Sequence, residues 1–160
     1  MSIFEKIVAR IDLPTRLETL ERPLVFTNGV FDLLHPGHVE YLERARSLGR
    51  SLVIGLNSDA SVRRLGKGED RPINGETDRA IMLAALESVT LVTLFAEQTP
   101  LELLGEVRPD IYAKGGDYDV ERLEETRLVR SYGGDARAIT FREGYSTTAL
   151  LHRIRSFDSQ

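Results

Sequence analysis

PLVFTNGVFDLLHPGHVEYLERARSLG, residues 23–49, contains the pattern that decides the fold. Residues 23–27 form a β-rich apolar run, typical of a buried strand, that ends at Asn28-Gly29. Gly49 is a helix stop signal, and before it apolar side chains recur at a helical period, at Val39, Leu42, Ala45 and Leu48. The stretch therefore predicts a strand, a polar turn and a helix.

The rest of the chain repeats this alternation of strand and helix. Further strand patterns occupy residues 51–56, 89–95, 110–113 and 136–141. Helical patterns occupy residues 59–65, 76–87, 99–107, 121–132 and 146–155. This order predicts an α/β fold, a Rossmann-like five-stranded parallel sheet with helices on both faces. We expect one domain over residues 1–160, with an N-terminal helix and connector in residues 1–22 and the core in residues 23–155.

The unusual polar segments of the sequence follow the predicted strands. They comprise residues 27–38, 57–59, 114–117 and 142–148. In open parallel sheets, ligands bind beyond the carboxyl ends of the strands, where the strand order switches. A glycine-rich, charged loop at residues 66–75 is long for a compact α/β unit, and such loops tend to be functional. We expect these segments to converge on one ligand site.

Composition limits the class of protein. The chain has 160 residues, no cysteine and a formal net charge of −4. The lack of cysteine excludes disulfide scaffolds, thiol catalysis and cysteine zinc sites, and the acidic balance disfavours a general nucleic-acid binder. No apolar run reaches the ~20 residues of a membrane helix, and charges interrupt the apolar residues of positions 1–10, unlike in a signal peptide. We therefore expect a cytoplasmic protein with no membrane or nucleic-acid partner.

The segment His35-Pro36-Gly37-His38 lies where the first predicted strand gives way to a helix. Two histidines three residues apart share one face of a first helical turn, where the helix N-terminus adds free N–H groups and partial positive charge. Pro36 suits that turn, and Gly37 would let a ligand approach the backbone. These features indicate a polyphosphate site with imidazole donors. Structural histidines are one alternative and metal ligation another, but no cysteine or third histidine lies near, and we expect no metal bound by the protein alone.

Residues 27–38, TNGVFDLLHPGH, closely resemble the signature of the HxGH cytidylyltransferase-like nucleotidyltransferases. Other segments match, in order, the branch that contains the adenylyltransferase domain of ADP-heptose synthesis: Asn57-Ser-Asp59, Arg71-Pro-Ile-Asn74, Lys114-Gly-Gly-Asp-Tyr118 and Glu143-Gly-Tyr-Ser-Thr-Thr148. The similarity covers roughly residues 23–155. Many members of this branch are fused to a sugar kinase. Because this sequence has no kinase portion, it resembles the stand-alone form.

The resemblance implies a reaction at the α-phosphorus of ATP. A phosphate oxygen of D-glycero-D-manno-heptose 1-phosphate attacks that phosphorus, ADP-heptose forms and pyrophosphate leaves, with Mg²⁺ held mainly by the phosphates. The implied partners are ATP and a phosphorylated sugar, the family favours a homodimer, and the product serves lipopolysaccharide or capsule synthesis. Positioning and charge stabilisation carry such in-line chemistry, so no side-chain nucleophile is required.

The resemblance also implies roles for individual residues. Catalytic roles fall to His35, His38, Lys67 and Arg71. Nucleotide binding falls to Thr27, Asn28, Gly29, Phe31, Gly37, Lys114, Gly115, Ser146, Thr147 and Thr148. Substrate binding falls to Asp32, Asn57, Asp59, Arg79 and Asp117. This chain reads Leu65-Gly66-Lys67 where the family places the lysine directly after the leucine, so the role of Lys67 is carried over with a shift of one position.

Plainer interpretations of some residues stay open. Asp32 suits a structural turn, residues 114–117 suit a tight turn, and the hydroxyls of residues 146–148 suit a helix cap. Two other functions compete for the whole chain. One is a cytidylyltransferase that acts on a polyol phosphate such as glycerol 3-phosphate, and the other is a nucleotide-binding module without catalysis.

Overall fold

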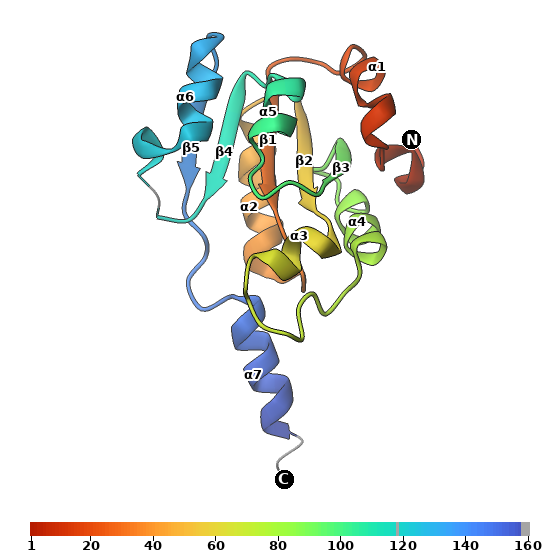
Figure 1. The fold of residues 1–160 in the computed structure, drawn as a ribbon, viewed down its shortest axis with the longest axis vertical. Coiled ribbons are helices and arrows are strands. Elements are labelled where there is room, and N and C mark those ends of the chain that lie inside the picture. Colours follow the sequence, from red (N-terminus) through yellow and green to blue (C-terminus); the bar gives the residue numbers. More distant parts are fainter. Residues whose placement is uncertain (118, 158–160) are drawn as a thin grey trace.

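Five parallel strands form the centre of the protein (Figure 1). The computed structural model describes residues 1–117 and 119–157. The strands are β1 (Leu24–Gly29), β2 (Ser51–Asn57), β3 (Leu91–Phe95), β4 (Ile111–Gly115) and β5 (Asp135–Ile139). They lie in the order β3-β2-β1-β4-β5, and each neighbouring pair is parallel. The predicted five-stranded parallel α/β sheet is confirmed.

Helices connect the strands. The α-helices are α1 (Leu13–Leu17), α2 (Pro36–Ser47), α3 (Asp59–Arg64), α4 (Glu76–Ala84), α5 (Leu101–Val107), α6 (Glu124–Ser131) and α7 (Thr147–Phe157). Short 3-10 helices are η1 (Ile3–Lys6), η2 (Arg10–Asp12) and η3 (Val120–Arg122). The helix predicted over residues 121–132 is thus divided into η3 and α6.

Apolar side chains of the strands form two cores, one on each face of the sheet. On one face, Val25 of β1 packs with Leu42 of α2 and Leu83 of α4. On the other face, Phe26 of β1 packs with Leu103 of α5. Because successive strand residues point to opposite faces, a sheet covered on both sides needs continuous apolar strands. β2 is buried at every position, and its central residues Leu52, Val53, Ile54 and Leu56 are apolar.

The strand order switches at β1, which has β2 on one side and β4 on the other. β1 pairs with β2 along its whole length but with β4 only at Val25 and Phe26. Past that point the hydroxyl of Tyr41, from α2, bridges the two strands. It donates to the carbonyl oxygen of Ala113 (3.1 Å) and lies 2.5 Å from Thr27 Oγ1. The carboxyl ends of β1 and β4 are therefore joined by a side chain where their backbone pairing stops.

The N-terminal segment differs from the amphipathic helix and connector that we expected over residues 1–22. It forms η1, η2 and the short helix α1, with extended residues between η1 and η2. Ile7 makes a parallel bridge to Val92 of β3, and the Val8 N–H donates to the Val92 carbonyl. Pairing with β3 covers the open edge of the sheet. This extended pairing interrupts the helix.

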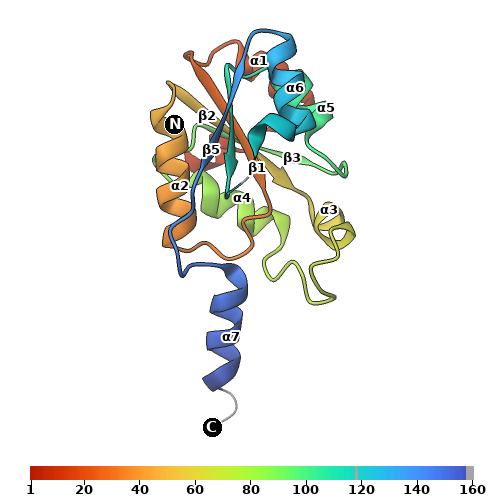
Figure 2. The same ribbon diagram turned by 90° about the vertical axis from the view of Figure 1, so that its left-hand side faces the viewer.

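Helix α7 projects from the sheet beyond the carboxyl ends of the strands (Figure 2). None of its residues is buried. Across residues 1–117 and 119–157, no helix is long and apolar enough to cross a membrane.

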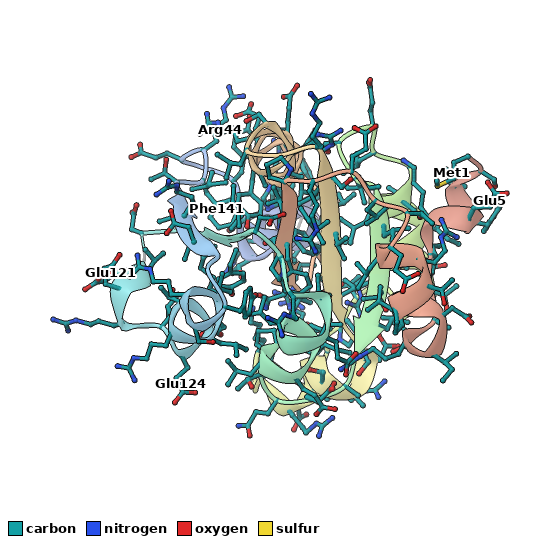
Figure 3. The ribbon with its side chains drawn as sticks, turned by 90° about the horizontal axis from the view of Figure 1, so that it is seen from above. Met1, Glu5, Arg44, Glu121, Glu124 and Phe141 are labelled. Atoms are coloured by element: carbon teal, nitrogen blue, oxygen red, sulfur yellow. The ribbon has the colours of Figure 1, made fainter. Side chains whose placement is uncertain are left out.

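Charged side chains of both signs surround the fold. Viewed from above, Glu5, Glu121 and Glu124 lie at the periphery (Figure 3). Several carboxylates pair with arginines, as Glu121 does with Arg130. Exposed pairs of this kind contribute little to stability, so the two cores carry the fold.

Candidate active site

A pocket of about 360 Å³ lies at the carboxyl ends of β1 and β4, where the strand order switches. Many residues predicted for the site line it: Asn28, Gly29, Phe31, Asp32, His35, His38, Lys67, Arg71, Lys114, Gly115, Ser146, Thr147 and Thr148. Residues that the sequence did not single out for the site also line it: Val30, Tyr41, Val62, Phe141 and Tyr145. Segments far apart in the sequence thus meet at the edge where ligands of such sheets bind.

The rings of His35 and His38 stack on each other at the start of α2. Their centroids are 3.8 Å apart and their planes meet at 19°. His35 is the N-cap residue, and its Nδ1 accepts a hydrogen bond from the His38 backbone N–H (3.3 Å). Because Nδ1 accepts, the proton of a neutral His35 ring lies on Nε2, which remains a donor. The pair therefore adds a ring donor to the N–H groups of a helix N-terminus, a combination suited to phosphate.

Burial disfavours the charged form of both histidines. It lowers the pKa of His35, and burial together with the adjacent His35 lowers the pKa of His38 to about 4. Within the described part of the chain, His38 Nδ1 has no hydrogen-bond partner. A bound polyphosphate would bring negative charge next to the rings and raise both pKa values. The pair can thus change from neutral rings to cationic donors when phosphate binds.

Phe31 turns the chain between β1 and the histidines. Its φ is 47°, a left-handed conformation that is uncommon for residues other than glycine. Its ring meets the His38 ring edge-on, with centroids 5.2 Å apart and planes at 63°. A Cβ atom on Gly29 would lie 2.9 Å from the Phe31 ring, so glycine leaves the space that this ring needs. Phe31 therefore supports His38 from the side of β1, at the cost of backbone strain of a kind that often marks functional sites.

Two polar residues at the end of β1 have different surroundings. The Tyr112 hydroxyl donates to Asn28 Oδ1 (2.9 Å), which leaves the Asn28 NH₂ group as a donor at the pocket. Thr27 is 1% exposed and does not line the pocket. Since the Tyr41 hydroxyl donates to Ala113, the Thr27 hydroxyl donates to Tyr41. The structure therefore places Thr27 in the link between β1 and α2, away from the pocket where we expected it.

Three cationic side chains line the pocket: Lys67, Arg71 and Lys114. Lys67 is exposed, whereas the Arg71 side chain is 12% exposed and forms an ion pair with Asp32 at 3.1 Å. The pKa of Lys114 is lowered, mainly by burial and further by the charge of Lys67. The charge of Glu125 partly opposes this shift. Both lysines line the same pocket, where each disfavours the charge of the other. This local excess of positive charge suits a triphosphate, although the whole chain is acidic.

Aromatic residues that the sequence did not identify as site residues form another part of the pocket wall. The Tyr145 ring stacks on His35, with centroids 6.1 Å apart. The Phe141 ring packs on Tyr41, with centroids 5.0 Å apart, and a methyl group on Gly115 would overlap it. Tyr145 lies inside the matched segment 143–148, which was the available signal. No signal in the sequence pointed to Phe141, because this residue follows β5 and only the fold brings it next to β4.

Hydroxyl groups at the start of α7 complete the lining. Ser146, Thr147 and Thr148 all border the pocket. Ser146 Oγ accepts from the Ala149 N–H (3.0 Å), so this side chain caps the helix as the plainer interpretation expected. Thr147 Oγ1 lies 3.5 Å from the carbonyl oxygen of Leu33, between the end of β1 and α2. The first turn of α7 is thereby held next to the histidine segment.

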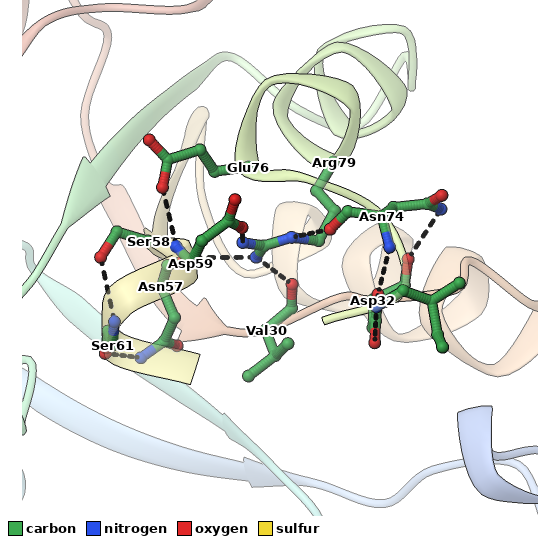
Figure 4. A network of polar contacts seen from close by, with 10 residues as sticks. Val30, Asp32, Asn57, Ser58, Asp59, Ser61, Asn74, Glu76 and Arg79 are labelled. Atoms are coloured by element: carbon green, nitrogen blue, oxygen red, sulfur yellow. Dashed lines mark hydrogen bonds and ion pairs between the residues drawn. The ribbon is translucent and has the colours of Figure 1, made fainter. Parts of the chain in front are cut away.

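Some predicted residues do not line the pocket: Thr27, Gly37, Asn57, Asp59, Arg79 and Asp117. A Cβ atom on Gly37 would lie 3.0 Å from the His35 ring, so Gly37 makes room for that ring. Arg79 is buried and contacts Asn57 and Asp59 (Figure 4). Asp117 is exposed just beyond β4. Tyr118, which belongs to a matched segment, lies outside the described residues.

The arrangement supplies donors and cations for a polyphosphate. The histidine pair, the Asn28 amide, the hydroxyls of residues 146–148 and the cations around Lys67 surround one cavity. The part of the chain that the structure describes contains no cluster of three or more histidine, aspartate or glutamate side chains that could bind a metal ion.

Comparison with known proteins identifies the family of this chain. The cytidylyltransferase-like family model matches residues 26–153. A D-beta-D-heptose 1-phosphate adenylyltransferase from Bordetella bronchiseptica is 59% identical over 152 residues, which cover 94% of this chain and 94% of that protein. A bifunctional protein HldE from Pelobacter propionicus is 56% identical over 131 residues, which cover 82% of this chain but only 27% of that protein.

A solved structure shares the fold. The lipopolysaccharide core biosynthesis protein from Thermoplasma volcanium GSS1 is 30% identical, with a TM-score of 0.63, over 77% of this chain and 98% of that one. The family match spans both ends of the pocket, from β1 to α7. The chain belongs to the cytidylyltransferase-like family.

Proposed function

We propose that this protein transfers AMP from ATP to D-glycero-D-manno-heptose 1-phosphate, giving ADP-heptose and pyrophosphate. The observation that carries the proposal is the stacked His35–His38 pair, which shares one pocket with Lys67, Arg71 and Lys114. The Bordetella bronchiseptica relative is named for adenylyl transfer to D-beta-D-heptose 1-phosphate. This name supports the choice of both nucleotide and sugar.

The reaction is an in-line displacement at phosphorus. An oxygen of the sugar phosphate forms a bond to the α-phosphorus of ATP. The bond from that phosphorus to the oxygen of the leaving group breaks, and pyrophosphate departs with the electron pair. Negative charge grows on the leaving group and on the α-phosphate oxygens, so donors and cations aimed at these oxygens lower the barrier.

Each group of residues has a role in this displacement. His35 and His38 donate to the α-phosphate and to the departing pyrophosphate. Lys67 and Arg71 neutralise the triphosphate from the loop side, and Lys114 does so from β4. The hydroxyls of residues 146–148, at the start of α7, bind phosphate oxygens. These roles need only positioned donors, since no side chain of the pocket has to form a covalent intermediate.

Mg²⁺ fits the pocket as the counterion of ATP. The described residues offer no cluster of carboxylates and histidines for it, and the Asp32 carboxylate is already bound by Arg71 and by backbone N–H groups. Mg²⁺ commonly keeps waters and binds through substrate phosphates. When bound it would neutralise phosphate charge, while Lys67 and Lys114 provide further positive charge and Arg71, paired with Asp32, provides guanidinium donors.

Magnesium-dependent release of pyrophosphate tests the proposal. ATP and CTP are each combined with both anomers of heptose 1-phosphate and with glycerol 3-phosphate. We expect release with ATP and one heptose anomer, the β anomer if the acceptor matches that of the Bordetella bronchiseptica relative. Release with CTP and glycerol 3-phosphate would instead support the polyol cytidylyltransferase. Nucleotide binding without release in any combination would support a non-catalytic module.

Two further expectations belong to this proposal. Consumption of ATP favours the cytoplasmic location expected from the sequence. The homodimer implied by the resemblance remains a prediction, and analytical ultracentrifugation of the full chain tests it.

A further inference from the structure

Arg79 is buried at the base of the charged loop and joins four parts of the chain (Figure 4). Its side chain has 0% exposure. Its guanidinium donates to the carbonyl oxygens of Val30 (2.8 Å), Asn57 (2.8 Å) and Asn74 (2.9 Å), and to Asp59 Oδ1 (2.7 Å). Val30 follows β1, and Asn57 is the last residue of β2. Asn74 lies in the loop, and Asp59 begins α3. Arg79 therefore locks the end of the loop against the ends of two strands.

Asp32 binds the same loop from the pocket side. Its side chain is 2% exposed and its carboxylate accepts from the N–H groups of Ile73 (2.9 Å) and Asn74 (2.9 Å) and from Arg71 Nη1 (3.1 Å). In turn, the side-chain amide of Asn74 donates to the backbone carbonyl oxygen of Asp32 (3.1 Å). Protein donors thus engage both carboxylate oxygens. An unpaired carboxylate would repel a triphosphate, whereas here Arg71 compensates its charge.

These contacts divide the loop into two parts. Residues 71–74 are held by Asp32 and Arg79. Residues 65–70 are exposed, and among them Gly66 and Gly68 have φ values of 67° and 126°. Lys67 lies between these two glycines, so the loop carries one cation on its exposed part and a second cation, from residue 71, on its anchored part.

We infer that Asp32 and Arg79 are positioning residues, which hold residues 71–74 so that the Arg71 guanidinium faces the phosphate pocket before nucleotide binds. This inference rests on the proposed function, which makes the pocket a triphosphate site. It replaces the direct contact with the acceptor that the sequence predicted for Asp32 and Arg79. Because Arg71 is already ordered, nucleotide binding does not have to include the entropic cost of immobilising its side chain.

A double-mutant cycle between Asp32 and Arg71 tests the inference. Asp32→Asn keeps the shape but sets an NH₂ group against donors of the loop. We expect it to weaken binding of Mg-ATP and of inorganic pyrophosphate about tenfold, and Arg71→Ala to do the same. If Asp32 acts through Arg71, the double variant binds no more weakly than Arg71→Ala, whereas independent effects multiply to about a hundredfold. Titration calorimetry measures all four proteins.

Arg79→Lys tests the other anchor. Lysine keeps the charge but cannot make the same set of directed hydrogen bonds. We expect faster amide hydrogen exchange at residues 73 and 74 and a higher KM for ATP, with a smaller change in kcat. If this variant does not fold, the cycle at Asp32 still decides the inference. Glu121→Gln is the matched control, because it removes only an exposed pair with Arg130, and it should leave exchange and kinetics unchanged.

The results separate this inference from the proposed function. If the wild-type protein releases pyrophosphate from ATP with a heptose 1-phosphate while the effects of Asp32→Asn and Arg71→Ala on binding multiply, the inference is wrong and the function stands. If the double variant matches Arg71→Ala but no combination of nucleotide and acceptor releases pyrophosphate, the inference stands and the proposed transferase function is wrong. A wild-type protein that binds neither phosphate compound contradicts both.

Discussion

The imidazole rings of His35 and His38 lie parallel within 19°, with 3.8 Å between their centroids. Two cationic rings would repel each other at this distance, and burial adds a cost for each charge. The pair is therefore neutral until a group of opposite charge arrives. A triphosphate is such a group, so its binding and the protonation of the pair favour each other.

Loss of the His38 ring should reduce turnover far more than it reduces stability. We expect His38→Ala to lower kcat by on the order of a hundredfold or more, as for loss of one pre-positioned donor. Steady-state pyrophosphate release measures the change, and circular dichroism checks the fold. His152→Ala, on the exposed face of α7, is the control. Near-normal turnover in a folded His38→Ala protein would remove His38 from the chemistry.

The same ring should make stability depend on pH. Burial and the adjacent His35 lower the pKa of His38 to about 4 in the folded protein, from an ordinary value of 6.5. Between these values the unfolded chain binds the proton and the folded chain does not, so stability falls as pH falls through this window. We expect the free energy of unfolding to fall less steeply in His38→Asn than in the wild type. Urea titrations from about pH 7 to about pH 4 measure both slopes, and equal slopes contradict the prediction.

Lys67 should affect nucleotide use without affecting folding. Because it is exposed between two glycines, Lys67→Ala should leave the melting temperature unchanged. We expect the KM for ATP to rise about tenfold, as for loss of one charged hydrogen bond. Arg63→Ala, an exposed cation of α3 that does not line the pocket, is the comparison. Unchanged kinetics in Lys67→Ala would place this lysine on the surface only.

The hydroxyl of Tyr112 should orient the Asn28 amide. Without the hydrogen bond to Oδ1, the amide can turn its oxygen toward the phosphates. We expect Tyr112→Phe to weaken ATP binding roughly fivefold, equivalent to about 1 kcal/mol. Tyr132→Phe is a matched control, since the Tyr132 hydroxyl has no hydrogen-bond partner among the residues that the structure describes. Equal ATP affinity in both variants would show that Asn28 needs no such support.

The sequence by itself determined the order and type of most elements. Buried strand runs and helical periods are local patterns, and the resulting parallel sheet follows from covering both faces of apolar strands. The position of the histidine pair could also be predicted, because a strand end and a helix start meet within residues 27–38. The structure of the N-terminal segment could not be predicted, because it depends on the pairing of Ile7 with Val92 of β3, which lies far away in the sequence.

Only the tertiary structure decided which polar side chains enter the pocket. The resemblance made both Arg79 and Asp32 candidates for substrate binding. Yet Arg79 donates to Val30, 49 positions away, and Asp32 accepts from Arg71, 39 positions away. Buried polar groups must find partners, and their partners here lie in other elements of the fold. A local sequence pattern indicates which residues can bind phosphate. Long-range packing determines which of these residues already have hydrogen-bond partners within the protein.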